Sequence, residues 1–264
     1  MALATTAGVD VTLITCTLGE LGEVIPKELA HLEGDGIALA GRRASELAGA
    51  CGALGVTDHR LLGGHGRWKD SGMVATGEGV RAAAPTDLGP DAFARPDAAD
   101  EQVDQLVEVL RELSPQVVVS YDASGGYGHP DHVRAHTITW RAVKAVDPLG
   151  ERVGLYATVM ARREVAAGLA ALRRRSWLPL PVPTVEDLAT VPDSIVTSRI
   201  ALGQARGAKL AALRAHATQV SVMDDGHEPP VYVLSNGLTQ PVLAAEHFVR
   251  LRGPDGALEK ILAL

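Results

Sequence analysis

The feature that most constrains the fold is a short apolar run, Val117–Tyr121 (VVVSY), that directly follows a segment with helical periodicity. A continuous apolar run of this length is typical of a strand buried on both faces of a parallel sheet. The preceding segment, Ala98–Leu113, repeats apolar residues at helical spacing, and Ser114-Pro115 ends it. Pro130–Val146 predicts another helix. Strands and helices that alternate in this way indicate an α/β fold with a doubly wound, mostly parallel, Rossmann-like sheet.

The rest of the chain continues this alternation. We expect the end of a helix at Met1–Gly8, strands at Val9–Cys16, His59–Leu62 and Tyr156–Met160, helices at Gly41–Leu54, Arg163–Arg175 and Ser198–Ala217, a long surface loop at Val74–Asp97, and a Pro-rich connector at Trp177–Pro192. Too little chain follows the connector for an independent core. We therefore expect one domain over residues 1–264, with residues 176–264 as a C-terminal extension that packs on the site.

Composition excludes several classes of protein. The net charge of -7 argues against nucleic acid as the main partner, because a phosphate backbone needs a concentrated basic surface. The sequence contains no apolar run long enough to span a membrane and no signal peptide with a basic start. Cys16 and Cys51 have no metal-type spacing and are expected to be small buried side chains. We expect a soluble cytoplasmic protein, and the oligomeric state stays open.

Reactive side chains concentrate in three loops that follow predicted strands: TLGELGEVI, GGHGRWKDSGM and DASGGYGHPDH. In open α/β sheets, ligands bind at the carboxyl ends of the strands. The three loops are expected at that edge, so the sequence predicts a single active site there.

The most informative loop is DASGGYGHPDHVRAH, in which two glycines provide a tight turn and a helix begins at Pro130. His129 and His132 are three residues apart, so both side chains can face one cleft. Asp131, between them, lies in the first turn, where the helix dipole favours a carboxylate that can orient an imidazole. This set suits either a metal with an orienting partner or a His–Asp acid/base pair. The plainer alternative is a helix start with incidental polar residues.

GGYGHPDHVRAH resembles the second motif of the LmbE-like (PIG-L) deacetylases, zinc enzymes that remove an acetyl group from an N-acetylglucosaminyl unit. TCTLGELGEVI, GGHGRWKDSGM and KLAALRAHATQV resemble the mycothiol-pathway branch of that family. This resemblance implies an amidohydrolase whose small-molecule substrate is an N-acetylglucosaminyl-inositol. The glycine in GYGHPDHV favours this activity over the related mycothiol S-conjugate amidase, which tends to carry a proline there. The conjugate amidase and a non-catalytic sugar-binding homologue without metal remain the alternatives.

The resemblance implies roles for four residues. His132 would be a ligand of the single Zn²⁺, and His129 would be the general acid that protonates the leaving amine, held by Asp131. Tyr127 would donate a hydrogen bond to the tetrahedral oxyanion. Amide hydrolysis needs an activated water, oxyanion stabilisation and a proton for the amine, and zinc acidifies its bound water.

Three further residues resemble substrate contacts of the family: Arg43, Asp70 and Glu23. Carboxylates suit the hydroxyl donors of a sugar. Arg43 and Glu46 are three residues apart, so an ordinary surface ion pair is the alternative for Arg43. Trp68 is expected to lie in the core.

The family takes two of its three zinc ligands and its general base from an Ala-His-Pro-Asp-Asp-Glu motif after the first strand, and this sequence does not contain that motif. We expect the first strand and two further ligands upstream of Met1, because of a wrongly chosen start codon or a clipped chain. The alternative is a degenerate homologue. Either way, the 264 residues are predicted to bind zinc weakly and to deacetylate little.

Overall fold

The computed structural model describes residues 1–75, 82–178 and 180–263. Residues 76–81 of the expected surface loop and Pro179 of the expected connector lie outside the described residues. The α-helices are α1 (Ala2–Thr6), α2 (Gly36–Leu54), α3 (Ala99–Leu113), α4 (Pro130–Val146), α5 (Arg162–Arg173), α6 (Arg206–Ala215) and α7 (Ala257–Ile261). Short 3₁₀ helices are η1 (Lys27–Leu32), η2 (Pro96–Ala98), η3 (Asp193–Ile195) and η4 (Gly203–Ala205).

The strands are short except for two. They are β1 (Thr12–Thr15), β2 (Asp58–Leu61), β3 (Val74–Ala75), β4 (Ala82–Ala83), β5 (Val117–Ser120), β6 (Gly154–Ala161), β7 (Thr190–Val191), β8 (Ser198–Ala201), β9 (Ser221–Met223), β10 (Val231–Val233), β11 (Thr239–Pro241) and β12 (Ala245–Arg252).

The strands nearest the predicted site pair in parallel. β1 pairs β2 in parallel, with Thr12 opposite Asp58, and β5 pairs β6 in parallel, with Val117 opposite Gly154. β12 lies antiparallel between β6 and β8, while β7 pairs β6 in parallel. Within the described residues, β1–β2 form a sheet separate from β5-β6-β12-β8.

Helices cover both faces of these strands. Neighbouring residues of a strand point to opposite faces, so they pack against different helices. Val118 of β5 packs, together with Ile14 of β1, against a core formed largely by α3 and α4. Val117 packs instead against the cluster that includes Tyr156, Phe248 and α7. Trp68 is 3% exposed and belongs to the α3–α4 core, as expected. The predicted α/β fold is therefore confirmed.

Local signals explain where the main helices begin and end. α2 begins at Gly36, earlier than expected, because the Asp35 side chain accepts a hydrogen bond from the backbone N–H of Ala38 at 3.0 Å. α3 ends where Ser114 takes a left-handed conformation (φ 47°) before a proline. α4 has the predicted bounds and carries Pro130 in its first turn.

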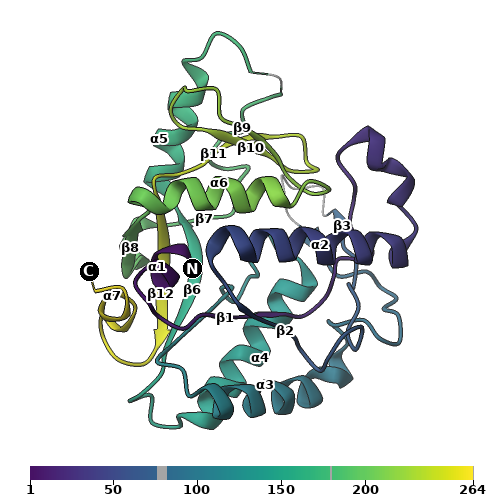
Figure 1. Ribbon diagram of the computed structural model, residues 1–264, viewed down its shortest axis with the longest axis vertical. Coiled ribbons are helices and arrows are strands. Elements are labelled where there is room, and N and C mark those ends of the chain that lie inside the picture. The colour runs from purple at the N-terminus through teal and green to yellow at the C-terminus, as the bar shows by residue number, and fades with distance from the viewer. Residues whose placement is uncertain (76–81, 179, 264) are drawn as a thin grey trace.

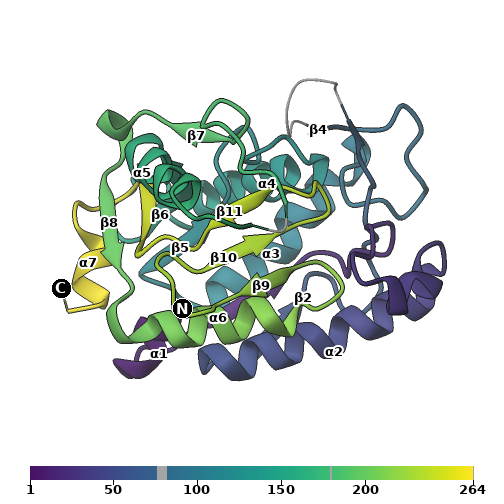
Figure 2. The ribbon, with the colours of Figure 1, turned by 90° about the horizontal axis from the view of Figure 1, so that it is seen from above.

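α2 and α6 lie side by side in both ribbon views (Figures 1 and 2), and in Figure 2 they run along one edge of the molecule. The small antiparallel sheet β9–β10–β11 lies next to α6. This arrangement brings the segment that follows α6 against the N-terminal half of the chain. None of the helices in the described ranges combines the length and apolar character needed to cross a bilayer.

One helix prediction was partly wrong. Residues 198–217 are not one long helix, because Ser198–Ala201 forms β8 and only Arg206–Ala215 forms α6. Ser198 and Ile200 are buried while Arg199 and Ala201 are exposed, so the segment has the period of two that a strand requires. The expected surface loop also contains the short strands β3 and β4 and the turn η2.

Candidate functional site

The candidate site begins with the turn between β5 and α4. Gly126 and Gly128, the two glycines of GYGHPDHV, have φ values of +67° and +96°. Proline is restricted to φ near −65°, so it fits neither conformation. A Cβ on Gly128 would also lie 2.5 Å from the backbone oxygen of Ala82. The turn thus requires glycine, and it places Tyr127 and His129 on either side of Gly128.

The two histidines of the motif are held in different tautomers. His129 is the N-cap of α4, and its Nδ1 accepts a hydrogen bond from the backbone N–H of Asp131 at 3.2 Å. The proton of the neutral ring therefore lies on Nε2. His132 Nδ1 lies 3.2 Å from the backbone oxygen of Gly125, so it donates and leaves a lone pair on Nε2. Burial lowers the pKa of His132 to about 4, which keeps this ring neutral near pH 7.

Two tyrosines pack around these rings. The ring of Tyr121 stacks on His132 with centroids 4.0 Å apart, and Tyr127 meets the same imidazole edge-on at 5.2 Å. The His129 and His132 centroids are 5.0 Å apart. Burial raises the pKa of Tyr127 to about 12, so its hydroxyl keeps its proton and stays a hydrogen-bond donor.

Asp131 contacts His129 through its backbone, while its carboxylate points elsewhere. Oδ2 accepts a hydrogen bond from the backbone N–H of Ser71 at 3.2 Å. Oδ1 is buried and has no hydrogen-bond partner among the described residues. Burial raises the pKa of this carboxyl to about 7. A buried acceptor without a donor is costly, so this oxygen is a natural position for an incoming donor or cation.

Asp70 joins the site from the loop after β2. Its Oδ1 lies 3.9 Å from His129 Nε2, which is the nitrogen that carries the proton, and also accepts from the backbone N–H of Gly72 at 2.9 Å. Burial lowers the pKa of His129, and the negative charge of Asp70 opposes that shift. The backbone N–H of Asp70 donates to the carboxylate of Glu20 at 3.0 Å.

Arg43 lies in α2 and Glu23 in the loop after β1, and the arginine contacts the backbone of Glu23 rather than its side chain. Arg43 is 6% exposed and donates to the backbone oxygens of Gly19 and Glu23, the second at 3.0 Å. The Glu23 side chain is exposed. Glu46 is buried as well, so Arg43 and Glu46 are not a surface ion pair; Glu46 pairs with Arg42 at 3.0 Å.

The structure therefore brings together Tyr127, His129, Asp131, His132 and Asp70, and it adds three residues not predicted as site residues. These are Glu20, Ser71 and Tyr121. All three stand in or next to the loops that end the predicted strands, so their position was a usable signal.

The donors for a metal are incomplete in the described part of the chain. Within residues 1–75, 82–178 and 180–263, no group of three or more His, Cys, Asp or Glu side chains is arranged to hold a metal ion. His132 Nε2 offers a lone pair and Asp131 Oδ1 a buried acceptor, but a catalytic zinc usually needs three protein ligands. These residues alone do not fit a zinc site.

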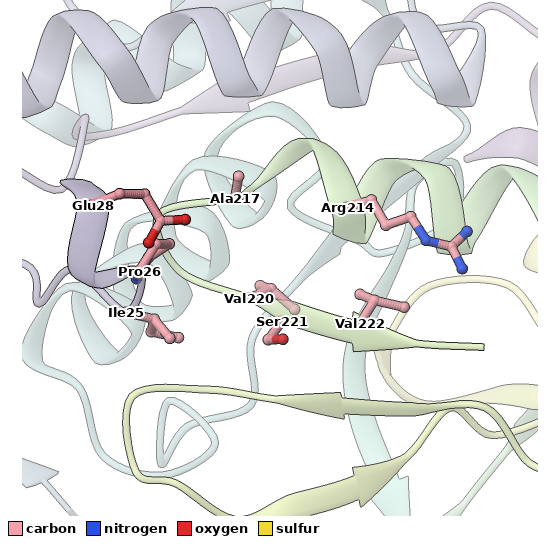
Figure 3. A pocket seen from close by; sticks show the side chains of 8 residues that line it. All are labelled: Ile25, Pro26, Glu28, Arg214, Ala217, Val220, Ser221 and Val222. Atoms are coloured by element: carbon pink, nitrogen blue, oxygen red, sulfur yellow. The ribbon is translucent and has the colours of Figure 1, made fainter. Parts of the chain in front are cut away.

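A separate cavity of about 340 Å³ lies away from the histidines (Figure 3). Its walls come from the start of η1, the end of α6 and strand β9. It is lined by Ile25, Pro26, Glu28, Arg214, Ala217, Val220, Ser221 and Val222. The reactive groups gather around His129 instead, so we assign the candidate site there.

Comparisons with known proteins identify the family of the chain. The model of the family described as GlcNAc-PI de-N-acetylase (PIG-L) matches residues 1–143. A 1D-myo-inositol 2-acetamido-2-deoxy-alpha-D-glucopyranoside deacetylase of Actinosynnema mirum is 48% identical over 256 residues, which cover 97% of this chain and 86% of the relative. The protein of that name from Saccharomonospora viridis is 47% identical over 248 residues, 94% of this chain and 86% of the relative.

A solved structure supports the fold. The chain is similar to a deacetylase crystallised with teicoplanin, with a TM-score of 0.50 and 19% sequence identity over 94% of this chain and 90% of that one. The family model and the relatives define an amidohydrolase, a deacetylase. Within that class, the chain belongs to the GlcNAc-PI de-N-acetylase (PIG-L) family.

Proposed function

We propose that this deacetylase hydrolyses the acetamide of an N-acetylglucosaminyl-inositol, the reaction for which its relatives in Actinosynnema mirum and Saccharomonospora viridis are named. The observation that carries the proposal is the cluster of Tyr127, His129, Asp131 and His132 at the carboxyl end of β5, in a chain 48% identical to such a relative. By the relatives' substrate, the pathway would be mycothiol biosynthesis.

Hydrolysis adds water to the acetamide carbonyl, breaks the C–N bond, and releases acetate and a free amine. His129 is suited to protonate the departing nitrogen, because the Asp131 N–H at its Nδ1 keeps the proton on Nε2. Tyr127 is suited to donate to the oxyanion, because its hydroxyl stays protonated. Asp70, with Arg43 of α2 and Glu23 of the neighbouring loop, is proposed to contact the sugar or inositol hydroxyls.

The zinc dependence implied by the family resemblance is part of the proposal, with His132 as the ligand that this chain supplies. The tautomer of His132 supports that role, because its lone pair lies on Nε2. When bound, zinc would supply an acidified water. The described residues supply neither the second nor the third ligand, so the roles given above rest on the protein side chains alone.

The test is release of primary amine from N-acetylglucosaminyl-inositol, with and without added zinc, alongside a mycothiol S-conjugate. We expect slow release of amine from the first substrate, faster release with zinc, and release about 10²-fold slower or more with His129→Gln. Preference for the S-conjugate would favour the conjugate amidase, the alternative that the glycine in GYGHPDHV disfavours. Binding of the sugar without hydrolysis would favour the non-catalytic homologue. If the chain neither binds nor hydrolyses the sugar, the proposal is refuted.

Two further predictions accompany the function. Residues 176–264 are proposed to act as an extension that packs on the site, supported by the contact between Ile25 and Thr218. The cytoplasmic location stays a prediction, which cell fractionation would test.

A further inference from the structure

A buried polar cluster outside the group of reactive side chains lies where α2 meets the segment that follows α6. Its members are Arg43, Glu46 and Thr218, which are 6%, 5% and 0% exposed. Glu46 accepts hydrogen bonds from both the backbone N–H of Thr218, at 3.0 Å, and its hydroxyl, at 2.7 Å. A buried carboxylate needs such donors, since burying it without them costs several kcal/mol.

Thr218 passes this connection on to the loop that carries Glu20 and Glu23. Its backbone oxygen accepts a hydrogen bond from the N–H of Ile25 at 2.9 Å. Its hydroxyl oxygen also lies 3.4 Å from Nε of Arg43, and the other end of that guanidinium donates to the backbone oxygens of Gly19 and Glu23. The loop is thus held at Gly19, Glu23 and Ile25 by groups that all connect to Thr218.

Two glycines, Gly19 and Gly22, leave room for the Arg43 side chain to reach these oxygens. A Cβ built on Gly19 or on Gly22 would overlap the guanidinium nitrogens of Arg43. The two glycines therefore leave the space that the arginine occupies, and the contact is a built feature rather than a chance approach.

The loop connects directly to the site. Glu20 accepts a hydrogen bond from the backbone N–H of Asp70 at 3.0 Å, and Asp70 Oδ1 lies 3.9 Å from His129 Nε2. His129 and His132 are oriented separately, by Asp131 N–H and Gly125 oxygen within the α4 turn. A disturbance of the loop should therefore displace Asp70 and Glu23 while it leaves the histidines in place.

We propose that Glu46 and Thr218 are positioning residues, which set the substrate-contacting side of the site by fixing the loop Gly19–Ile25 to α2. This inference rests on the proposed function, since it assigns Asp70 and the loop to substrate binding. The pair joins residues 172 positions apart in the sequence, so it also makes the C-terminal segment part of the site's support.

The test uses Thr218→Val, which keeps the side-chain shape but removes the hydroxyl, and Thr218→Ser, which restores it. Glu46→Gln removes the charge from the other partner. Asp147→Asn is the matched control, because Asp147 is a buried carboxylate with backbone donors that lies outside the site. The measurements are KM and kcat on N-acetylglucosaminyl-inositol and hydrogen exchange of the Ile25 and Asp70 amides.

We expect Thr218→Val and Glu46→Gln to raise KM about tenfold, the effect of one buried hydrogen bond lost, with kcat within about threefold. The Ile25 and Asp70 amides should exchange faster in both, and Thr218→Ser should resemble the parent. Asp147→Asn should lose stability with KM unchanged, because unfolding lowers the active fraction and not the affinity. Unchanged KM and unchanged exchange in Thr218→Val would overturn the proposal, as would equal changes in Asp147→Asn. If the parent does not turn over the substrate, the proposed function fails, and the exchange of the two amides alone decides the positioning role.

Discussion

Asp147 at the end of α4 allows a stability prediction with a defined magnitude. Its carboxylate accepts hydrogen bonds from the backbone N–H groups of Val153, Arg152 and Glu151, at 3.0, 3.0 and 3.3 Å. These donors, foremost that of Val153, lower the pKa of Asp147 to about 2. The Arg152 guanidinium lies 3.8 Å away but its side chain is 72% exposed, so solvent screens it and the backbone donors dominate.

The lowered pKa contributes to folding free energy. An unfolded aspartate titrates near 4, and each pKa unit corresponds to about 1.4 kcal/mol, so the ionised carboxylate stabilises the native state by about 2.5 kcal/mol at pH 7. Because the folded pKa is depressed, this contribution is fully present above pH 4 and is lost as the pH falls through 2. About half of it remains at pH 3.

Urea unfolding of Asp147→Asn at pH 7, 5 and 3 measures this term. We expect the variant to be about 2.5 kcal/mol less stable than the parent at pH 7, and the gap to shrink by about half at pH 3. Asp100→Asn is the control, since the Asp100 side chain is 86% exposed and its pair with Arg141 should contribute little. A gap below about 0.5 kcal/mol at pH 7, or one that stays constant with pH, would refute the reasoning.

Three further variants test the site. His129→Gln should lower kcat for amine release by about 10²- to 10⁴-fold while sugar binding, followed by calorimetry, persists; unchanged kcat would remove His129 from the reaction. Tyr127→Phe should lower kcat by about 10²-fold with little change in KM, and a pure KM effect would contradict its oxyanion role. Gly128→Ala should lower the free energy of unfolding by about 1–3 kcal/mol, because the φ of Gly128 is +96° and a Cβ there would lie 2.5 Å from the Ala82 oxygen. Gly41→Ala is the control and should not destabilise, since Gly41 lies in α2 with open space around it. Thermal unfolding measures both.

The helices that the sequence predicted best are those with strong local signals. α3 and α4 match their expected ranges within one residue, because apolar periodicity, a following proline or a leading proline marks their ends. The C-terminal strands carried no such signal. β12 is held by pairing with β6, where Phe248 lies opposite Thr158, and such long-range pairs leave little local pattern. For the same reason Ser198–Ala201 was wrongly predicted to be part of a helix.

The features of the site also differ in how well the sequence predicts them. His129, Asp131 and His132 share one turn, so their spacing alone predicted that they would meet. Asp70 comes from another strand end, and the doubly wound topology predicted its neighbourhood but not its 3.9 Å approach to His129. The tautomers could not be predicted, because they depend on which backbone group each ring nitrogen meets. The role of Thr218 could not be predicted, for the same reason as β12, since its partner Glu46 lies 172 residues away in the sequence.

The division of the sheet has a consequence for how the protein behaves at high concentration. In the described part of the chain, β1 pairs only with β2 and β5 only with β6, so each has one edge of free N–H and C=O groups. Val119, in the middle of β5, is 47% exposed beside such an edge. Open edges of this kind are templates for pairing with another chain. For the 264 residues by themselves we expect self-association by backbone pairing at β1 and β5, which a lysine or proline placed in β5 should suppress more effectively than added surface charge elsewhere. A further strand paired with these edges would suppress it in the same way.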